Sequence, residues 1–450
     1  MPQLLSILHT IFDMAIVLGF LILIHEFGHY ATAKYFGVRV EVFSIGFGKR
    51  LLGFTRGDTD YRISALPLGG YVKMSGENPM DDRTGDPGEF LSHPRWQRFI
   101  IALAGPTMNI MLAVALLATV YMVHYEYPSV YDEPTVVGWV SPGTPAEKAG
   151  IQSGDRIVRV EDVKDPNWED VDSKVMLSPN QPLTFDIERD GKVMEKVLVP
   201  EPIGSYQYGD IGWVPKESNS ILTLVEPGMP ADKAGIKVGD KILTANGQDI
   251  PDLGVLIQML NRTKDKPLQL VILRDGQKLT FMVNPTHDPS APAEDARYRI
   301  GVLSIPTKVI KLGFSEALKR SLSDNKKNSF LILELLQKMV RHKVSMRSVD
   351  GPIGIGRDVG QAAREQGWTP LLQITAAISL NLGIMNLLPI PILDGGVILL
   401  LFVESLMQKE ISLPIKERIY QAAFVFLVLF AVMVIYNDLV KTLPGLTRMP

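Results

Sequence analysis

The sequence contains no cysteine and only seven histidines. The absence of cysteine excludes disulfide bonds, a cysteine nucleophile and any metal site built from thiolates. A transition metal would therefore have to be held by histidine, aspartate or glutamate side chains. Because the histidines are few, each of them can be considered separately.

The chain also lacks an excess of charge of either sign. It has 46 basic and 49 acidic residues, a formal net charge of −3, and therefore no general field that would attract a polyanion. We accordingly expect no nucleic-acid partner. A mean hydropathy of +0.12 over 450 residues instead indicates about three structural units, partly in a membrane and partly soluble.

Long apolar segments divide the chain. Four of them reach or nearly reach the roughly 20 residues that a helix needs to cross a bilayer. The first runs directly into a polar motif, without a basic start or a small-residue cleavage site, so we interpret it as a retained span and not as a signal peptide. The predicted fold is a polytopic α-helical membrane protein with four transmembrane helices, at residues 4–30, 98–123, 370–393 and 419–437.

Basic residues predict the orientation of these spans. The loop 33–98 contains ten Lys or Arg residues, which favours the cytoplasmic side. The long segment 124–369 then lies on the opposite side, and four spans return both termini to that side. The N-terminal membrane part is predicted at 1–125 and the C-terminal one at 370–450.

A repeat occupies the segment between the second and third spans. Residues 140–157 and 225–242 match at twelve of eighteen positions with an offset of 85, and Arg-Asp-Gly recurs at 189–191 and 274–276. Each copy resembles a PDZ domain, a small α+β fold that captures peptides at a sheet edge. We predict PDZ-like domains at 126–218 and 219–305, which bind a peptide or protein ligand, restrict access to the membrane part by their bulk, or do both.

The region 306–369 is predicted to contain an amphipathic helix. Its most apolar part, 328–340, is too short to span a bilayer and carries Glu334 and Lys338. Such a helix lies either on membrane lipid or on a neighbouring protein surface.

The motif His25-Glu26-Phe27-Gly28-His29 is the strongest local signal. Residues i and i+4 lie on one face of a helix, so both imidazoles can bind one Zn²⁺ while Glu26 acts as general base. Ionisable residues at the end of an apolar span are unfavourable in a bilayer unless they are paired or hydrated, which favours a functional site over two structural histidines.

A third zinc ligand is expected from the third span. Asp394 follows an uncharged stretch that ends in Pro389 and Pro391, and it precedes Gly395 and Gly396. Together with HEFGH, the segment NLLPIPILDGG resembles the site-2 protease family of intramembrane zinc metalloproteases. The resemblance extends to the segments FSIGFGKRL, RISALPLGGYVKM and AGPTMN and to the paired PDZ domains. It implies that His25, His29 and Asp394 bind zinc, that Glu26 is the general base and that Asn386, with Asn381 of the same segment, binds substrate.

The segment 61–74 suggests a β hairpin with a Pro-Leu-Gly-Gly turn. Its edge could accept a strand of substrate, or the hairpin could pack on the spans. The substrate-binding residues predicted there are Ile63, Ala65, Leu66, Leu68, Gly69 and Gly70. Gly105, Pro106 and Asn109 in the second span match the family, but they are also compatible with a packing notch and a kink.

The resemblance implies peptide-bond hydrolysis in the bacterial inner membrane, with the active site toward the cytoplasm and the PDZ-like domains and both termini periplasmic. The implied substrate is a single-span anti-sigma factor of the envelope stress response, cut after a prior extracytoplasmic cleavage; signal-peptide remnants form a second class. A non-enzymatic scaffold would not need HEFGH and Asp394, and a zinc transporter would need more polar ligands in its spans.

Overall fold

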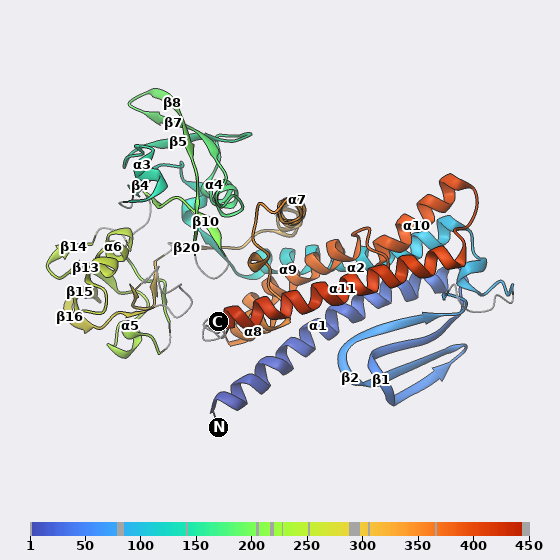
Figure 1. Cartoon of the computed structure of the whole chain (residues 1–450). Helices are drawn as coiled ribbons and strands as arrows, with labels where there is room; N and C mark the ends of the chain where they lie inside the picture. The colour runs from blue at the N-terminus through green and yellow to red at the C-terminus, as the bar shows by residue number, and fades with distance from the viewer. Residues whose placement is uncertain are drawn as a thin grey trace, which may run out of the picture. The chain divides into compact units, whose positions relative to one another are not determined.

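The computed structural model describes residues 2–78, 85–140, 143–203, 207–216, 220–226, 228–250, 253–287, 298–304, 307–364 and 367–442. These residues form two compact units, whose elements are labelled in Figure 1. We call the first the membrane unit; it comprises Met1–Tyr125, Lys311–Leu333 and Asp350–Asp438. We call the second the repeat unit; it is built mainly from Glu126–Ile310 and Glu334–Val349.

The membrane unit is mainly helical because its sequence contains long apolar segments with few helix-breaking residues. Helix α2 packs against α1, α9 and α10, and α8 packs against α1 and α9. The helices are α1 (Pro2–Tyr35), α2 (Arg95–Val123), the first part of α7 (Phe314–Val340), α8 (Pro352–Arg364), α9 (Thr369–Asn386), α10 (Asp394–Met407) and α11 (Leu413–Thr442), with a short 3₁₀ turn at Phe90–Ser92.

Three helices of the described chain are long and apolar enough to cross a membrane, at His9–Tyr35, Arg95–Val123 and Leu413–Val440. Many of the side chains on α11 that face away from the protein are apolar, such as Phe424 and Leu429, which suits contact with lipid. The remaining predicted span, at 370–393, is not among these three helices of the described chain. Helix α9 has only 18 residues and ends at Asn386, before Pro389 and Pro391, because proline cannot continue a helix.

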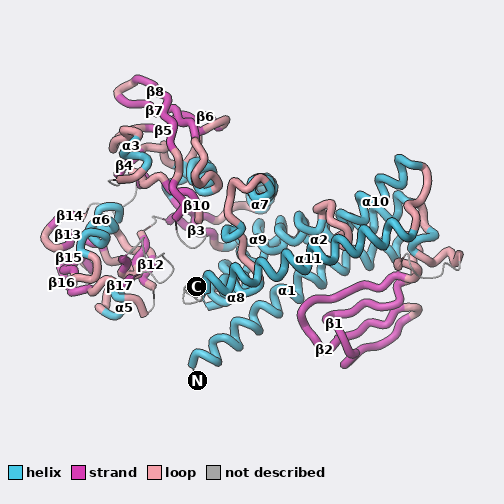
Figure 2. Tube along the Cα trace, in the orientation of Figure 1, coloured by secondary structure: helices cyan, strands magenta, loops and turns pink. Residues whose placement is uncertain are grey.

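Strands β1 (Val40–Arg56) and β2 (Thr59–Met74) form an antiparallel sheet beside the C-terminal end of α1. Both strands are long and curl, so Phe43 of β1 pairs with both Val72 and Tyr61 of β2. Figure 2 accordingly shows them as several adjacent strand segments. The segment 70–74 of β2 pairs on one side only, with the start of β1, and is therefore an edge of the sheet.

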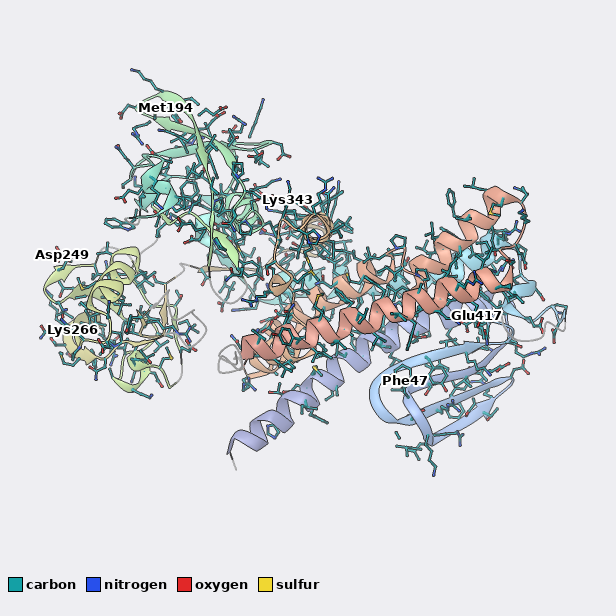
Figure 3. All side chains as sticks on the ribbon, in the orientation of Figure 1. Phe47, Met194, Asp249, Lys266, Lys343 and Glu417 are labelled. Carbon is teal, nitrogen blue, oxygen red and sulfur yellow. The ribbon has the colours of Figure 1, made fainter. Side chains whose placement is uncertain are left out.

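The predicted hairpin at 61–74 is wrong in its turn. All of these residues belong to β2, but its segments 60–63 and 70–73 pair with opposite sides of residues 42–45 and not with each other. A tight turn lies earlier, at Gly57, where φ is +62°. Gly69 has a φ of +131°, and a Cβ there would lie 2.5 Å from the ring of Phe47, which Figure 3 labels on this sheet. Gly69 thus helps β2 to bend back past an aromatic side chain, without the tight turn of a two-stranded hairpin.

A small apolar core fixes this sheet to the helices. It joins Ala33 of α1, Val40 of β1, Val72 of β2 and Ile101 of α2, which are all buried. The edge of β2 is thereby held next to the part of α1 that contains HEFGH.

The repeat unit contains two four-stranded antiparallel sheets with the same strand order, β6-β5-β7-β8 and β14-β13-β15-β16. In the first domain these are β5 (Arg156–Val160), β6 (Val163–Lys164), β7 (Leu183–Arg189) and β8 (Lys192–Leu198), with helices α3 (Pro145–Lys148) and α4 (Trp168–Met176). In the second domain they are β13 (Lys241–Ala245), β14 (Gln248–Asp249), β15 (Leu268–Arg274) and β16 (Gln277–Val283), with α5 (Pro230–Lys233) and α6 (Leu253–Thr263).

Short strand pairs complete the repeat unit, which ends in a 3₁₀ turn at Met346–Ser348. The paired strands are β3 (Tyr125–Pro128) with β20 (Thr307–Ile310), β4 (Val137–Val140) with β11 (Trp213–Pro215), β9 (Glu201–Ile203) with β10 (Tyr208–Asp210), β12 (Leu224–Val225) with β19 (Val302–Leu303), and β17 (Thr286–His287) with β18 (Tyr298–Arg299).

The repeated Gly-Asp and Arg-Asp-Gly motifs form the same ion pair in each domain. In the first, Arg189 Nε donates to Asp155 Oδ1 at 2.6 Å and its Nη2 donates to Gly150 O at 2.7 Å. In the second, Arg274 makes the corresponding bonds to Asp240 at 2.7 Å and to Gly235 O at 2.8 Å. This pair connects the turn before the first strand of each sheet to the end of the central strand, and we call it the Arg–Asp clamp.

Candidate metal centre

Three side chains from the two ends of the membrane unit's sequence meet in one cluster. His25 and His29 lie one turn apart on α1, and Asp394 is the first residue of α10. His25 Nε2 lies 3.1 Å from Asp394 Oδ2, His29 Nε2 lies 3.4 Å from Asp394 Oδ1, and the two Nε2 atoms are 3.2 Å apart. Both histidines are only 8% exposed.

This donor set fits zinc. A tetrahedral zinc ion with bonds of about 2.0–2.1 Å keeps neighbouring ligand atoms about 3.3 Å apart. The three separations in the cluster lie close to that value. Two imidazoles and one carboxylate supply three ligands, which leaves the fourth position of a catalytic zinc site available.

Two close approaches allow α1 and α2 to form this cluster. A Cβ at Gly105 of α2 would lie 2.2 Å from Nε2 of His29, and a Cβ at Gly28 of α1 would lie 2.5 Å from the carbonyl oxygen of Ala104. Glycine is therefore required at both positions. The structure supports a packing role for Gly105. The absence of a side chain there makes room for the ring of His29.

The loop between α9 and α10 brings Asp394 to the histidines. A Cβ on Gly395 or Gly396 would lie 2.3 Å from carbonyl oxygens of residues 387–390, so the chain folds back tightly at this point. Ile392 has a φ of +91°, which is unfavourable for a β-branched residue. Such backbone strain is found mainly where surrounding packing enforces it, often next to functional sites.

Glu26 points to the edge of β2. Its Oε2 accepts a hydrogen bond of 3.0 Å from the backbone N–H of Val72. The backbone N–H of Met74, two residues further along the same edge, donates to Glu77 Oε2 at 3.2 Å. Burial raises the pKa of Glu77, although this hydrogen bond acts in the opposite direction.

A cavity of 570 Å³ opens beside the cluster. The sequence predictions Asn386 and Gly70 both contribute to its wall, together with Glu26, the metal cluster and Asn109. Its lining also includes Arg98 and a buried ion pair in which Lys416 Nζ lies 2.7 Å from Glu404 Oε1. This pair joins α10 to α11, and the sequence analysis did not identify it.

The structure does not bring every predicted substrate-binding residue to this cavity. Asn381 is exposed and its amide donates to Ala377 O of its own helix at 3.0 Å. Ile63 and Ala65 are exposed in an earlier segment of β2, away from the edge at 70–74. Gly69 contacts Phe47 and does not line the cavity. Leu66 and Leu68 lie in β2, but their side chains are outside the described residues.

Comparison with known proteins agrees with this geometry. Residues 13–430 match the sequence profile of peptidase family M50, and the chain therefore belongs to this family of site-2 proteases. It is similar to protease RseP of Yersinia pestis, with 32% identity over 96% of this chain and 99% of that protein. The regulator of sigma-E protease RseP of Escherichia coli K12 is 30% identical, over 96% of this chain and 99% of that protein.

A third relative, from Vibrio cholerae, is named for zinc metalloprotease activity; it is 29% identical over 97% of this chain and 99% of its own length. The chain is thus a multi-pass membrane zinc metalloprotease with homology to RseP proteins, and its cofactor is zinc.

Proposed function

We propose that this protein hydrolyses a peptide bond within or near the transmembrane segment of single-span membrane proteins. The observation that carries this proposal is the position of the His25, His29 and Asp394 cluster, which lies on an apolar helix next to Glu26 and an edge of a β-sheet. A protease that acts on membrane-embedded segments needs all three of these features in one cavity.

In this proposal His25, His29 and Asp394 would hold the zinc ion, which would supply Lewis-acid chemistry at this site. Glu26 is the general base: it takes a proton from the attacking water and passes it to the leaving amine. The hydrogen bond from Val72 N–H orients the Glu26 carboxylate and leaves its second oxygen for this proton transfer.

The substrate has to unwind before it is cut, because a transmembrane helix uses its own carbonyl groups in internal hydrogen bonds. The edge of β2 at 70–74 could pair with the unwound segment if the substrate backbone displaces Glu77 from the N–H of Met74, while the N–H of Val72 stays bonded to Glu26. Gly70 lets this edge pack closely on β1, since a Cβ there would lie 2.7 Å from the carbonyl oxygen of Ser44. Asn386, at the end of α9, could donate a hydrogen bond from its amide to the substrate backbone.

We further propose four spans, with α9 crossing the membrane within a bundle of the other helices. Its 18 residues extend roughly 27 Å. In this topology the active site faces the cytoplasm, and the PDZ-like domains and both termini are periplasmic. By analogy with the sigma-E regulator of E. coli, the substrate is an anti-sigma factor of the bacterial inner membrane, trimmed beforehand, with signal-peptide remnants as a second class.

The decisive experiment is cleavage of a single-span reporter in liposomes, with zinc content measured on each variant. Glu26→Gln should retain zinc and lose roughly 10²–10⁴-fold in cleavage rate, because the general base is removed. Asp394→Asn should bind zinc more weakly. Asp13→Asn, on the same helix but three turns from His25, serves as the control and should match the wild type. A Glu26→Gln variant that cleaves at the wild-type rate would exclude the proposed mechanism.

The two PDZ-like domains have different grooves, which favours peptide binding in the second. Its groove of 340 Å³ is lined by apolar residues of α6, including Leu256 and Ile257, and by Val302. In the first domain the residue equivalent to Val302 is Trp213. Each follows a glycine of positive φ, and the residue before that glycine accepts a backbone hydrogen bond from α3 or α5. Trp213 packs on Trp168 of α4, with ring centroids 6.1 Å apart.

A fluorescent peptide with an apolar C-terminal residue and a free carboxylate tests this difference. Ile257→Asp should abolish its binding, because the change places a charge in an apolar groove. Val238→Asp, an exposed position outside the groove, is the matched control. If the wild type binds no such peptide, restriction of access becomes the preferred role. In that case deletion of residues 135–285 should allow cleavage of a substrate that retains its extracytoplasmic domain.

A further inference from the structure

The two histidines of the cluster differ in the group that contacts Nδ1, the ring nitrogen that points away from Asp394. Each directs Nε2 toward Asp394. His29 Nδ1 donates to the backbone carbonyl of Ile101 at 2.8 Å, which fixes the orientation of its ring. His25 Nδ1 instead faces the side-chain amide of Asn109, whose Nδ2 lies 3.4 Å away.

Asn109 is an unusual residue at this depth. It lies in α2, is 1% exposed, and its Oδ1 is buried without a hydrogen-bond partner. A buried amide oxygen with no partner loses free energy that hydration would otherwise supply. Within the described residues, the amide of Asn109 is thus both enclosed and incompletely satisfied.

Rotation of the Asn109 amide by 180° gives its unpaired Oδ1 a hydrogen-bond donor, and it also removes an unfavourable contact between two donors. A histidine that binds a metal through Nε2 is neutral and carries its proton on Nδ1. Without the rotation, the amide nitrogen of Asn109 and the Nδ1–H of His25 would be two hydrogen-bond donors facing each other. After rotation, Oδ1 of Asn109 accepts from Nδ1–H of His25, so the orphaned oxygen gains a donor. The two orientations of a side-chain amide occupy nearly the same space.

The backbone at Asn109 is held in place by α9. Ser379 Oγ, which is fully buried, donates to the carbonyl oxygen of Asn109 at 2.8 Å. Gly383, one turn later on α9, allows close packing, since a Cβ there would lie 3.0 Å from Pro106 O and 3.5 Å from Asn109 Cβ. The amide is therefore presented to His25 by two helices that are packed together.

We propose that Asn109 is a positioning residue of the zinc site: its Oδ1 accepts the Nδ1–H of His25, selects the tautomer that offers Nε2 to the metal, and fixes the ring. It does for His25 what the carbonyl of Ile101 does for His29. This inference rests on the proposed ligand set. Partners of this kind are important for metal affinity because they orient the ligand and raise its basicity.

The test is a measurement of zinc affinity on the full-length protein in detergent, by competition with a chromophoric chelator. Asn109→Leu replaces the amide by an apolar group of similar size and should weaken zinc binding about 10–100-fold. Asn109→Ala, which adds no bulk beside Gly383, should weaken it by a similar factor. Asn109→Asp keeps the acceptor and should bind zinc within about three-fold of the wild type.

Two controls separate this role from other effects. Thr107→Val, on the same helix, removes an exposed hydroxyl that donates to Leu103 O of its own helix, and should leave zinc affinity unchanged. His25→Ala should lose tight binding. Wild-type affinity in His25→Ala would overturn the ligand set itself. Loss in His25→Ala, combined with wild-type affinity in Asn109→Leu and Asn109→Ala, would overturn only the role of Asn109. Equal weakening in Asn109→Asp and Asn109→Leu would also overturn it.

Discussion

The membrane unit and the repeat unit both bury charged side chains, but they pair them differently. In the repeat unit the Arg–Asp clamp joins residues 34 positions apart within one small domain, and it occurs twice. In the membrane unit the partners belong to different helices: Asp394 of α10 meets His25 of α1, and Asp438 of α11 accepts backbone N–H groups at the start of α8.

This difference reflects the surroundings of each unit. A soluble domain can leave most charges in water and needs only a few buried pairs, whereas a polar group among membrane helices has no water to pair with. An ionisable side chain buried among the membrane helices therefore requires a partner, which in these cases comes from another element. Some of these contacts, such as those of Asp394 with His25 and of Glu404 with Lys416, also line the cavity.

The largest stability effect should come from the pair Glu404 and Lys416. Both side chains are almost fully buried, at 2% and 7% exposure, and Glu404 also accepts from the backbone N–H of Ile411. Removing one partner leaves a buried charge, so Glu404→Leu or Lys416→Leu should each destabilise by about 3–5 kcal/mol. Unfolding by SDS in mixed micelles measures this.

Replacing both Glu404 and Lys416 by leucine provides the control, because an apolar pair in the same space avoids the uncompensated charge. This double variant should be much closer to the wild type than either single variant. Single variants with wild-type stability would show that the cavity wall tolerates a lone charge, and would remove the proposed contrast between the two units.

A smaller and more local effect is expected at the Arg–Asp clamps. Asp155→Asn and Asp240→Asn should each lower the stability of their own domain by about 1.5–3 kcal/mol, since each removes a charged hydrogen bond to arginine. Hydrogen exchange on the full chain should locate the loss of protection in the mutated domain only. If Asp155→Asn loosened the second domain as well, the two domains would not be independent copies.

The smallest effect concerns pH and the first domain alone. Burial, with smaller contributions from Asp210 and Glu169, raises the pKa of Asp172 from 3.8 to about 6. The raised pKa means that the folded domain favours the neutral acid. Its contribution to stability is complete below pH 3.8 and is lost as the pH rises through about 6.

Asp172→Asn should therefore stabilise the first domain by about 1–3 kcal/mol at pH 7 and have little effect at pH 4. Urea unfolding followed by tryptophan fluorescence is suitable, because this domain contains Trp139, Trp168 and Trp213. Asp165→Asn, whose side chain is 81% exposed, is the control. Equal stabilisation at both pH values would contradict the role of Asp172. Ile257 occupies the corresponding position of α6, so the second domain should lack this pH dependence.

The comparison also explains which predictions from the sequence agreed with the structure. The HEFGH spacing places two imidazoles on one helical face, so the cluster of His25 and His29 follows from local geometry. The repeat was evident because twelve of eighteen residues match at one offset. The meeting of Asp394 with these histidines agrees with the expectation from its placement and from the family resemblance.

For other residues, contacts between distant elements decided where the side chain lies, which the sequence did not reveal. Gly69 and Gly70 suggested a turn, but the curled pairing of β1 with β2 uses them to pass Phe47 and the carbonyl of Ser44. Asn381 and Asn386 are five residues apart, and only Asn386 lines the cavity. The positions of these residues along the chain do not reveal which side of α9 faces the site.

The sequence alone determined the membrane segments at both ends of the chain, the duplicated domain and the metal-binding spacing on α1, because each depends on residues close together or on exact repetition. The tertiary structure decided which polar groups meet. It brought Asn109 to His25, Val72 to Glu26 and Lys416 to Glu404, since these contacts depend on how separate helices and strands pack when buried polar groups must find partners.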